Sequence, residues 1–349
     1  MLGWMSGGSM RSMLKIFSAK IVIFSQKSCI FAEKFFVMRL LVIVGPTATG
    51  KTAVATRVAA RLGGEVISGD SRQVYRGMDI GTGKDLSEYV VDGVEIPYHL
   101  IDIAPAGYKY NLYMFQRDFN AVYSDIVSRG KQPILCGGTG LYIEAVLGGY
   151  QLLEVPVNEA LRKELEGLDN ERLKARLLGY PNYKPHNITD FANRRRLVRA
   201  IEIEDYYANN VAHGVDVPEI EPVIYGIDIP RDLRRERITA RLDKRLNEGM
   251  VDEVRGLIAG GVKPEDLIYY GLEYKYVTQY VTGELEFAEM RRLLEISIHQ
   301  FAKRQMTWFR GMERRGYKIE WIDGTSDVEE RVNQILENFL KKSAETFGG

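Results

Sequence analysis

Three features of the sequence predict an α/β fold, in which helices flank a parallel sheet and a helical domain is inserted. Residues 40–52, LLVIVGPTATGKT, join an apolar strand-like run to a phosphate-binding loop pattern. Short apolar runs then alternate with helical patterns through the first third of the chain. Between residues 156 and 221 no strand pattern appears. Because alternating strands and helices build parallel sheets covered on both faces, the core is expected to be P-loop NTPase-like.

The first predicted strand, residues 40–44, leads into the phosphate-binding loop, and a helix over residues 53–62 follows it. The loop GPTATGKT fits the pattern G-x-x-x-x-G-K-[ST], and both flanks have the character that the pattern requires. Backbone N–H groups of such a loop and the N-terminus of the next helix point at an anion. Lys51 adds a cation for the phosphates, and Thr52 can offer its hydroxyl group to Mg²⁺. We therefore expect a diphosphate or nucleotide site at Gly45, Pro46, Thr47, Ala48, Thr49, Gly50, Lys51 and Thr52.

Further strands are predicted at residues 65–68, 96–103 and 132–136, with a helix over residues 115–129 between the last two. Each strand run is short and apolar and is followed by a polar or glycine-rich loop. Ligands of parallel sheets bind at the carboxyl ends of the strands. The loop after residue 68 and the GGTG loop, residues 137–140, should therefore converge with the P-loop on one site.

Two of these loops carry polar side chains that suit catalysis. Asp70, beside Ser71 and Gln73, would hold Mg²⁺ through water or act as a general base, unless it only satisfies its own turn. Thr139 offers a hydroxyl group among glycines that let the backbone approach a ligand, although an ordinary strand-to-helix turn explains the same residues. The strand over residues 132–136 does not end in Asp, which argues against an ordinary ATPase.

Residues 156–221 are charged and helical in pattern, which predicts a helical domain inserted into the core. A strand over residues 222–229 resumes the core, and the Arg-rich segment after it is mostly helical in pattern. A last strand, residues 317–322, and a closing helix, residues 328–342, are predicted near the end. We expect residues 38–155 and 222–349 to form the P-loop core with its C-terminal helices.

Composition limits the classes of function. The chain has 349 residues, a net charge of zero, two cysteines and four scattered histidines. These features exclude a globally basic nucleic-acid binder, a disulfide framework and a zinc site, so an RNA surface must be a local patch. No apolar run approaches the roughly 18 residues that a membrane span needs. We expect a cytoplasmic monomer that does not contact a membrane.

Residues 1–37 differ in composition from the rest. They hold one acid, Glu33, against five basic residues, a composition typical of an organelle-targeting peptide or a weak signal sequence. We favour Met38 as the true start, because MRLLVIVG opens directly into the first strand and no small-residue cleavage site follows a clean apolar region. This extension is excluded from the fold prediction.

Two segments with a helical pattern are rich in basic residues. One is NRRRLVR, residues 193–199, and the other is HQFAKRQMTWFRGMERR, in which Trp308 and Phe309 are interleaved. Basic side chains beside aromatic ones suit RNA, through phosphate pairing and base stacking. A solvated helix face with aromatic residues in the core explains the same pattern, so the pattern alone leaves both interpretations open.

Six motifs, in their order, resemble those of the tRNA dimethylallyltransferase (tRNA isopentenyltransferase) family: GPTATGKT, ISGDSRQVYRGMDIGTGK, HLIDI, PILCGGTGLY, RRLVRAIEI and AKRQMTWFR. The resemblance extends from about residue 38 to about residue 324. It implies that the five-carbon group of dimethylallyl diphosphate moves to the exocyclic amine of the adenine 3′ of a tRNA anticodon. The P-loop would then hold a leaving diphosphate, whose charge Lys51, with Mg²⁺ on Thr52, would stabilise.

The resemblance also implies roles for single residues. Asp70 would be the general base, and Thr47 and Thr139 would line the channel between donor and acceptor. Arg162 would lie near that channel. The target adenine would have to be flipped out of its stack. Contacts with the tRNA anticodon stem-loop are implied for Asp70, Ser71, Arg72, Gln73, Arg195, Arg196 and Arg199, although Arg195 stands where the family has Gln.

One segment departs from the family pattern, which is close to R-x-x-G-Y-[RK] at a place that touches tRNA. Here the sequence is YGLEYK, residues 270–275, with Tyr270 in place of Arg and Glu273 in place of Gly. An acid on an RNA-facing loop weakens phosphate contact, so we expect a different tRNA set or an altered RNA substrate.

Two other activities remain open on the sequence. A related isopentenyltransferase would act on free AMP or ADP, and a P-loop small-molecule kinase would turn over ATP. A small-nucleotide enzyme needs neither the basic clusters nor the inserted domain. Both features favour tRNA as the acceptor.

Overall fold

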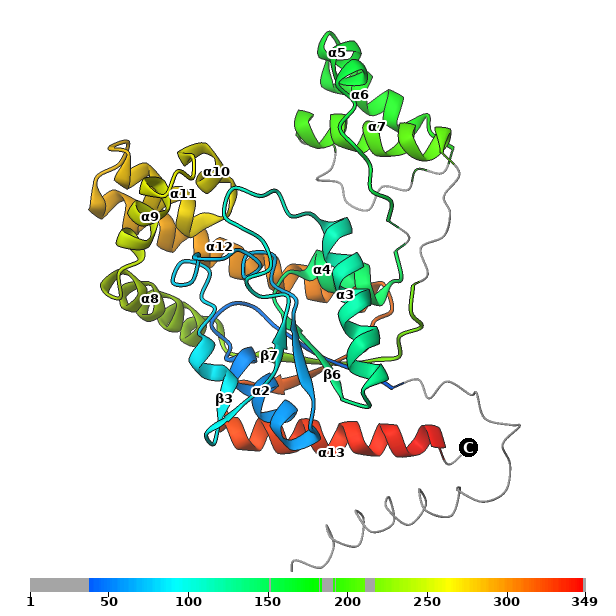
Figure 1. Ribbon diagram of the computed structural model, residues 1–349, viewed down its shortest axis with the longest axis vertical. Helices are drawn as coiled ribbons and strands as arrows, with labels where there is room; N and C mark the ends of the chain where they lie inside the picture. Colours follow the sequence, from blue (N-terminus) through cyan, green and yellow to red (C-terminus); the bar gives the residue numbers. More distant parts are fainter. Residues whose placement is uncertain are drawn as a thin grey trace, which may run out of the picture. The chain divides into compact units, whose positions relative to one another are not determined.

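Six parallel strands form the sheet that organises the molecule (Figure 1). The structure, a computed structural model, describes residues 38–150, 152–181, 183, 191, 193–210 and 217–347. The strand order is β5–β2–β6–β1–β7–β8, so β1 lies between two neighbours and the loop that follows it is central. The strands are β1 (Leu40–Val44), β2 (Glu65–Ser68), β5 (Tyr98–His99), β6 (Pro133–Gly137), β7 (Pro222–Asp228) and β8 (Ile319–Asp323).

The sheet is buried on both faces because its central strands are apolar along their whole length. All residues of β1 (LLVIV) and of β6 (PILCG) are buried. Successive side chains of a strand point to opposite faces. Accordingly, Leu40, Val42 and Val44 join one hydrophobic cluster, and Leu41 and Ile43 join another. Unbroken apolar strands are typical of parallel sheets covered by helices on both sides.

Helices from distant parts of the chain supply the two covers. Phe119, Ile143 and Phe309 bring helices to the first cluster, and Val58 and Ile335 bring helices to the second. The first set is α3 (Leu112–Ser128), α4 (Gly140–Leu147) and α12 (Phe287–Arg314), and the second is α2 (Lys51–Leu62) and α13 (Val328–Phe347). Between β7 and α12 the chain forms α8 (Arg231–Asn247), α9 (Met250–Ala259), α10 (Pro264–Tyr269) and α11 (Leu272–Val281). A short 3₁₀ helix, Leu86–Tyr89, and the antiparallel pair β3 (Val90–Val91) and β4 (Val94–Glu95) lie between β2 and β5.

Three helices before β7 pack around a hydrophobic cluster of their own. They are α5 (Glu159–Glu166), α6 (Asn170–Leu178) and α7 (Arg194–Asn209). Asn158 and Asp169 cap the first two, because each side chain accepts a hydrogen bond from a backbone N–H three residues on. The buried members of the cluster are Leu161, Leu165, Leu173, Leu177, Leu197 and Ile201.

The predicted α/β fold with a parallel sheet is confirmed, but one predicted strand is wrong. Of residues 96–103, only Tyr98 and His99 form a strand beside β2. Leu100 and Asp102 have φ angles of +61° and +57°, which turn the chain out of the extended conformation.

Three helices differ in their ends from the predictions. The helix after the P-loop begins at Lys51 rather than at residue 53, the helix predicted over residues 115–129 spans Leu112–Ser128, and the closing helix continues to Phe347. Within the described ranges, no helix combines the length and the apolarity that crossing a membrane requires. The predictions for residues 1–37 lie outside the described residues.

Candidate active site

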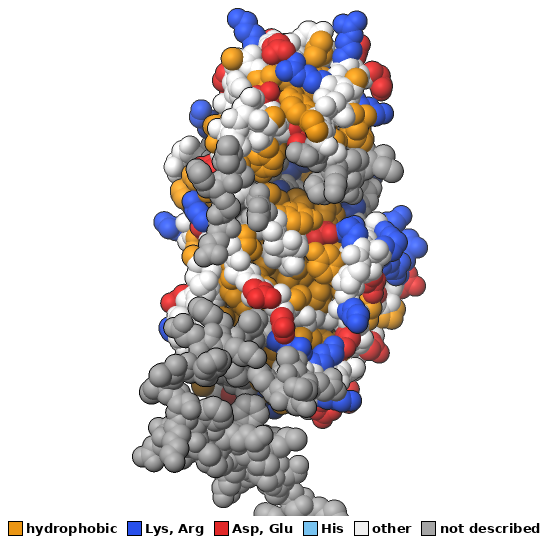
Figure 2. Space-filling view, turned by 90° about the vertical axis from the view of Figure 1, so that its right-hand side faces the viewer, with side chains coloured by type: hydrophobic (Ala, Val, Ile, Leu, Met, Phe, Trp, Pro, Cys, Tyr) orange, Lys and Arg blue, Asp and Glu red, His pale blue; other side chains and the backbone are white. Residues whose placement is uncertain are grey.

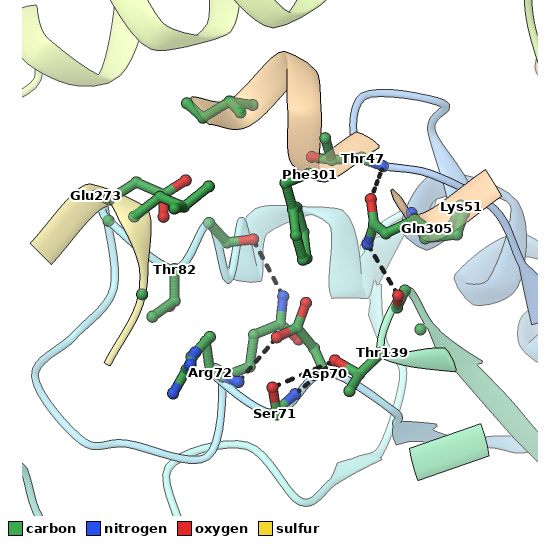
Figure 3. Close-up of a pocket in the computed structure, with 18 of the residues that line it drawn as sticks. Thr47, Lys51, Asp70, Ser71, Arg72, Thr82, Thr139, Glu273, Phe301 and Gln305 are labelled. Atoms are coloured by element: carbon green, nitrogen blue, oxygen red, sulfur yellow. Dashed lines mark hydrogen bonds between the residues drawn. The ribbon is translucent and has the colours of Figure 1, made fainter. Parts of the chain in front are cut away.

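A cavity of about 510 Å³ lies where β1, β2 and β6 end (Figure 3). Its walls come from the P-loop, from the loops after β2 and β6, and from α8, α11 and α12. Three strand-end loops therefore meet at the carboxyl edge of the sheet, where parallel sheets bind ligands. The lining includes these residues singled out from the sequence: Thr47, Lys51, Thr52, Asp70, Ser71, Arg72, Gln73 and Thr139.

Two glycines shape the P-loop. Gly45 has φ +153°, and a Cβ there would lie 2.4 Å from the carbonyl oxygen of Ile227 in β7. Gly50 has φ +79° and is the left-handed residue immediately before α2. The loop therefore turns back into the N-terminus of α2, and the first two residues of that helix, Lys51 and Thr52, line the cavity.

Lys51 is a partly buried cation in this wall. Its Nζ donates a hydrogen bond to the carbonyl oxygen of Pro46 at 2.8 Å, within the same loop. Burial lowers the pKa of Lys51 more than the nearby acidic groups raise it. A bound diphosphate would supply the countercharge that such a cation requires. Glu88, which sequence reasoning missed, lies near Thr52; burial raises the pKa of its carboxyl, and the Thr52 hydroxyl offsets part of that rise.

Asp70 and Thr139 face each other across the ends of β2 and β6 (Figure 3). The Thr139 hydroxyl accepts a hydrogen bond from the Ser71 backbone N–H at 3.1 Å and donates to the Ser71 hydroxyl at 3.3 Å. Asp70 Oδ1 accepts from the Arg72 backbone N–H at 2.9 Å. Its Oδ2 has no hydrogen-bond partner within the described residues and is free to accept a proton from a ligand.

The side-chain amide of Gln73 is occupied within the protein. Its Oε1 accepts from the Ser68 hydroxyl at 2.8 Å, and its Nε2 donates to the carbonyl oxygen of Gly83 at 3.2 Å. Gln73 therefore joins the end of β2 to a second loop of the cavity wall. The expectation that Gln73 contacts the tRNA receives no support from these hydrogen bonds.

Gln305 of α12 joins two loops of the cavity. Its Oε1 accepts from the Thr47 backbone N–H at 2.8 Å, and its Nε2 donates to the carbonyl oxygen of Gly138 at 2.9 Å (Figure 3). The side chain is buried. It therefore fixes the P-loop relative to the loop that carries Thr139. The motif AKRQMTWFR contains Gln305, but the sequence gives no sign that its side chain reaches the P-loop.

Two arginines of α8 complete the basic part of the wall. Arg241 and Arg245 are four residues apart and so lie on one face of the helix, and both line the cavity. Both also form ion pairs with Asp85. Burial lowers the pKa of Arg245. Sequence reasoning missed these residues, although their i, i+4 spacing in the Arg-rich segment was the available signal.

Glu273 lies in a helix rather than in the expected loop. It is in the first turn of α11 and lines the cavity. Gly271, with φ +139°, is the residue before this helix and turns the chain into it. Burial raises the pKa of Glu273.

The arginines predicted in the inserted helices do not line the cavity. Arg162 donates to both carboxylate oxygens of Glu202, at 2.7 and 3.0 Å, and Arg199 donates to the same carboxylate at 3.2 Å. The Glu202 side chain is fully buried. These two arginines therefore hold the inserted helices together. Arg195 lies over the ring of Tyr269 in α10, 5.7 Å from its centroid, and Arg196 is exposed.

Comparisons with known proteins agree on one family. The model of the IPP transferase family matches residues 73–312, and that of the isopentenyl transferase family matches residues 38–96. A tRNA dimethylallyltransferase 1 of Parabacteroides distasonis is 59% identical over 304 residues, which cover 86% of this chain and 98% of that one. A tRNA dimethylallyltransferase 2 of Bacteroides fragilis is 54% identical over 308 residues, with 88% and 98% covered.

Solved structures agree with the sequence matches. The full-length tRNA isopentenylpyrophosphate transferase of Bacillus halodurans is 31% identical, with a TM-score of 0.64, over 88% of this chain and 97% of that one. A eukaryotic dimethylallyltransferase that acts on tRNA shares the fold, with a TM-score of 0.68 at 22% identity. Fold, P-loop and matching family model together place the chain in the IPP transferase family.

Proposed function

We propose that this protein transfers the dimethylallyl group of dimethylallyl diphosphate to the exocyclic N6 amine of the adenine 3′ of the anticodon in tRNA. The observation that carries the proposal is that one cavity is lined both by the P-loop and by Asp70, whose Oδ2 has no hydrogen-bond partner among the described residues. Relatives named tRNA dimethylallyltransferase support tRNA as the acceptor and the dimethylallyl group as the group transferred. The absence of an Asp at the end of β6 fits a loop that binds a leaving diphosphate.

In the reaction, a bond forms between adenine N6 and C1 of the donor, and the bond from C1 to the diphosphate oxygen breaks. The bonding electron pair leaves with the diphosphate. P-loop N–H groups, Lys51 and Arg241 are the groups that would stabilise its growing charge. Because their dipoles and charges are already oriented in a partly dehydrated wall, little reorganisation is needed during the step.

Asp70 is the residue we assign as general base. The amine of adenine is a weak nucleophile because its lone pair is delocalised into the ring, and its N–H becomes acidic as the new bond forms. Asp70 Oδ2 would accept that proton while Oδ1 keeps its hydrogen bond to Arg72 N–H. Thr139 and Ser71 would orient the loop that carries this carboxylate, and Thr47 would line the channel.

The oxygen donors beside the P-loop fit Mg²⁺. Magnesium is usually held by one or two protein oxygens together with phosphate oxygens and water. Thr52 offers a hydroxyl group for that purpose, and Glu88 near it offers a carboxylate. When bound, the ion would neutralise charge on the diphosphate.

The RNA would contact basic and aromatic surfaces around the cavity. Lys and Arg side chains gather along one margin and at one end of the face in Figure 2, beside a strip of hydrophobic side chains. Arg304 and the exposed ring of Phe301 lie at the cavity itself. Such groups suit phosphate pairing and stacking of a flipped adenine. We assign Arg195 and Arg196 to phosphate contacts, and Arg162 and Arg199 to the support of Glu202.

The test uses labelled dimethylallyl diphosphate with unmodified tRNA, with AMP or ADP, or with ATP alone. Label in tRNA, at the adenine 3′ of the anticodon, is the expected result. Label only in the free nucleotide would favour the small-nucleotide enzyme, and ATP hydrolysis without transfer would refute both prenyltransferase functions. Cytoplasmic location and a monomeric state are also proposed, and cell fractionation and light scattering test them.

A further inference from the structure

Glu273 is an acid in the wall of a cavity whose other charged lining groups are mostly basic. It enters from the first turn of α11, on the side of the cavity away from Thr47 and Gln305 (Figure 3). Within the described residues, its carboxylate has no side-chain hydrogen-bond donor and is bonded only to its own backbone N–H. The carboxylate is therefore available to a ligand at the end of the cavity farther from the P-loop.

The wall that carries Glu273 is rigidly anchored. The neighbouring Tyr274 donates a hydrogen bond to Glu253 at 2.6 Å, and its ring packs directly on Gly81. Glu253 also accepts from the backbone N–H groups of Asp79, Ile80 and Gly81, at 2.7, 2.7 and 3.0 Å. A side chain on such a supported element is held in place before its ligand arrives, as specific recognition requires.

An ionised carboxylate only accepts hydrogen bonds, so it can recognise N–H and O–H groups but repels phosphate. In the proposed reaction, diphosphate occupies the opposite end, with Lys51 and Arg241. The remaining groups of suitable chemistry belong to the acceptor RNA, whose 2′-hydroxyl and base amino groups are donors. Burial raises the pKa of Glu273, and the nearby guanidinium groups of Arg245 and Arg72 offset part of that rise.

We propose that Glu273 is a specificity residue that accepts a hydrogen bond from an N–H or O–H group of the RNA beside the reacting amine. This inference rests on the proposed function. Two sources offer the required donor: the 2′-hydroxyl of the target adenosine, and an exocyclic amino group of a neighbouring base. Either would make the protein select RNA by a contact separate from the chemistry at Asp70.

The test measures every protein variant with every RNA substrate, so that the effects of a protein change and of an RNA change can be compared singly and together. The variants are Glu273→Gln, which keeps the shape, and Glu273→Ala, with Glu337→Gln, an exposed acid of α13, as the matched control. The substrates are an anticodon stem-loop, the same stem-loop with a 2′-deoxy target adenosine, and stem-loops whose neighbouring bases lack an exocyclic amino group. Initial rates give kcat/KM for each pair, and KM for dimethylallyl diphosphate is measured separately.

We expect Glu273→Ala to lower kcat/KM for the unaltered stem-loop about 10- to 100-fold, the loss typical of a hydrogen bond to a charged group. KM for the donor should stay within about twofold of its original value, since no interaction with diphosphate is removed. With the altered stem-loop that lacks the recognised donor, Glu273→Ala should lower kcat/KM little further, so the losses caused by the protein change and by the RNA change are not additive. The stem-loop that behaves in this way identifies the RNA group that donates the hydrogen bond.

Additive penalties for every stem-loop, or a loss that appears in the donor KM, would overturn the inference. Full restoration by Glu273→Gln would support the inference, because the amide oxygen of Gln still accepts a hydrogen bond. Transfer to the unaltered stem-loop by the unsubstituted protein distinguishes failure of the proposed function from failure of the role of Glu273. If that transfer is absent, the proposed function fails; if it is present and the Glu273 variants behave like Glu337→Gln, only the role of Glu273 fails.

Discussion

Replacing Gln305 with alanine tests whether the two halves of the cavity must be held at a fixed distance. Gln305 accepts from Thr47 N–H and donates to Gly138 O, and it is the residue through which α12 joins the two loops. The substitution leaves both backbone groups without this partner. It also removes an amide that lies close against Gly138, where a Cβ would come within 2.4 Å of Nε2.

The expected magnitude follows from these two groups. An unpaired buried backbone donor or acceptor costs about 1–3 kcal/mol. Both groups border the cavity, so water can partly replace the hydrogen bonds of the side chain. We therefore expect a cost near the lower end of this range for each group. The free energy of unfolding should therefore fall by about 2 kcal/mol for Gln305→Ala. A displacement of the loops by about 1 Å would lower kcat by about 100-fold, because transfer depends on the alignment of donor and acceptor.

The assay compares Gln305→Ala with Gln116→Ala. Gln116 in α3 is equally buried and donates to a backbone carbonyl, that of Ala145 at 3.2 Å, but it does not line the cavity. Urea unfolding and steady-state transfer to tRNA are measured for both variants. Both should be less stable, and only Gln305→Ala should lose kcat. Equal losses of kcat in the two variants, or an unchanged kcat for Gln305→Ala, would refute the reasoning.

Three further predictions concern charged groups. Asp70→Asn keeps the hydrogen bond from Arg72 N–H but cannot take a proton. The value of kcat should therefore fall about 10²- to 10⁴-fold, with little change in the KM for dimethylallyl diphosphate. A large rise in that KM would indicate a role in holding Mg²⁺ instead. Arg241→Ala should raise the KM for dimethylallyl diphosphate at least about tenfold in steady-state assays, because a charge-assisted contact is lost, and an unchanged donor KM would remove Arg241 from the diphosphate site. Hydrogen bonds from Arg129 lower the pKa of Glu65 from 4.5 to about 2. A group with a lowered folded pKa stabilises the fold fully above its unfolded pKa, and this stability is lost as the pH falls toward the folded pKa. Arg129→Ala should therefore reduce the slope of stability against pH between about pH 4.5 and 2 in acid unfolding followed by circular dichroism, whereas an unchanged slope would contradict the pairing.

The P-loop was predictable because all of its determinants are local. Gly45, Gly50, Lys51 and Thr52 fall within eight residues, and their backbone geometry follows from the absence of a side chain at the two glycines. The strands β1 and β2 were equally clear, since a buried parallel strand requires an unbroken apolar run. The short β5 was predicted too long, because nothing in its apolar run signals the positive φ angles of Leu100 and Asp102.

The sequence by itself determined the parallel α/β sheet, the phosphate-binding loop and the resemblance to a family, because these depend on patterns over short stretches. Only the tertiary structure decided which distant side chains complete the cavity. Gln305 and Thr47 are 258 residues apart, yet the backbone N–H of Thr47 in the P-loop donates a hydrogen bond to the Gln305 side chain. Likewise, Arg162 and Arg199 meet Glu202 rather than the cavity, and Glu273 points into it. Such contacts depend on how helices pack on the sheet, which no periodicity along the chain encodes.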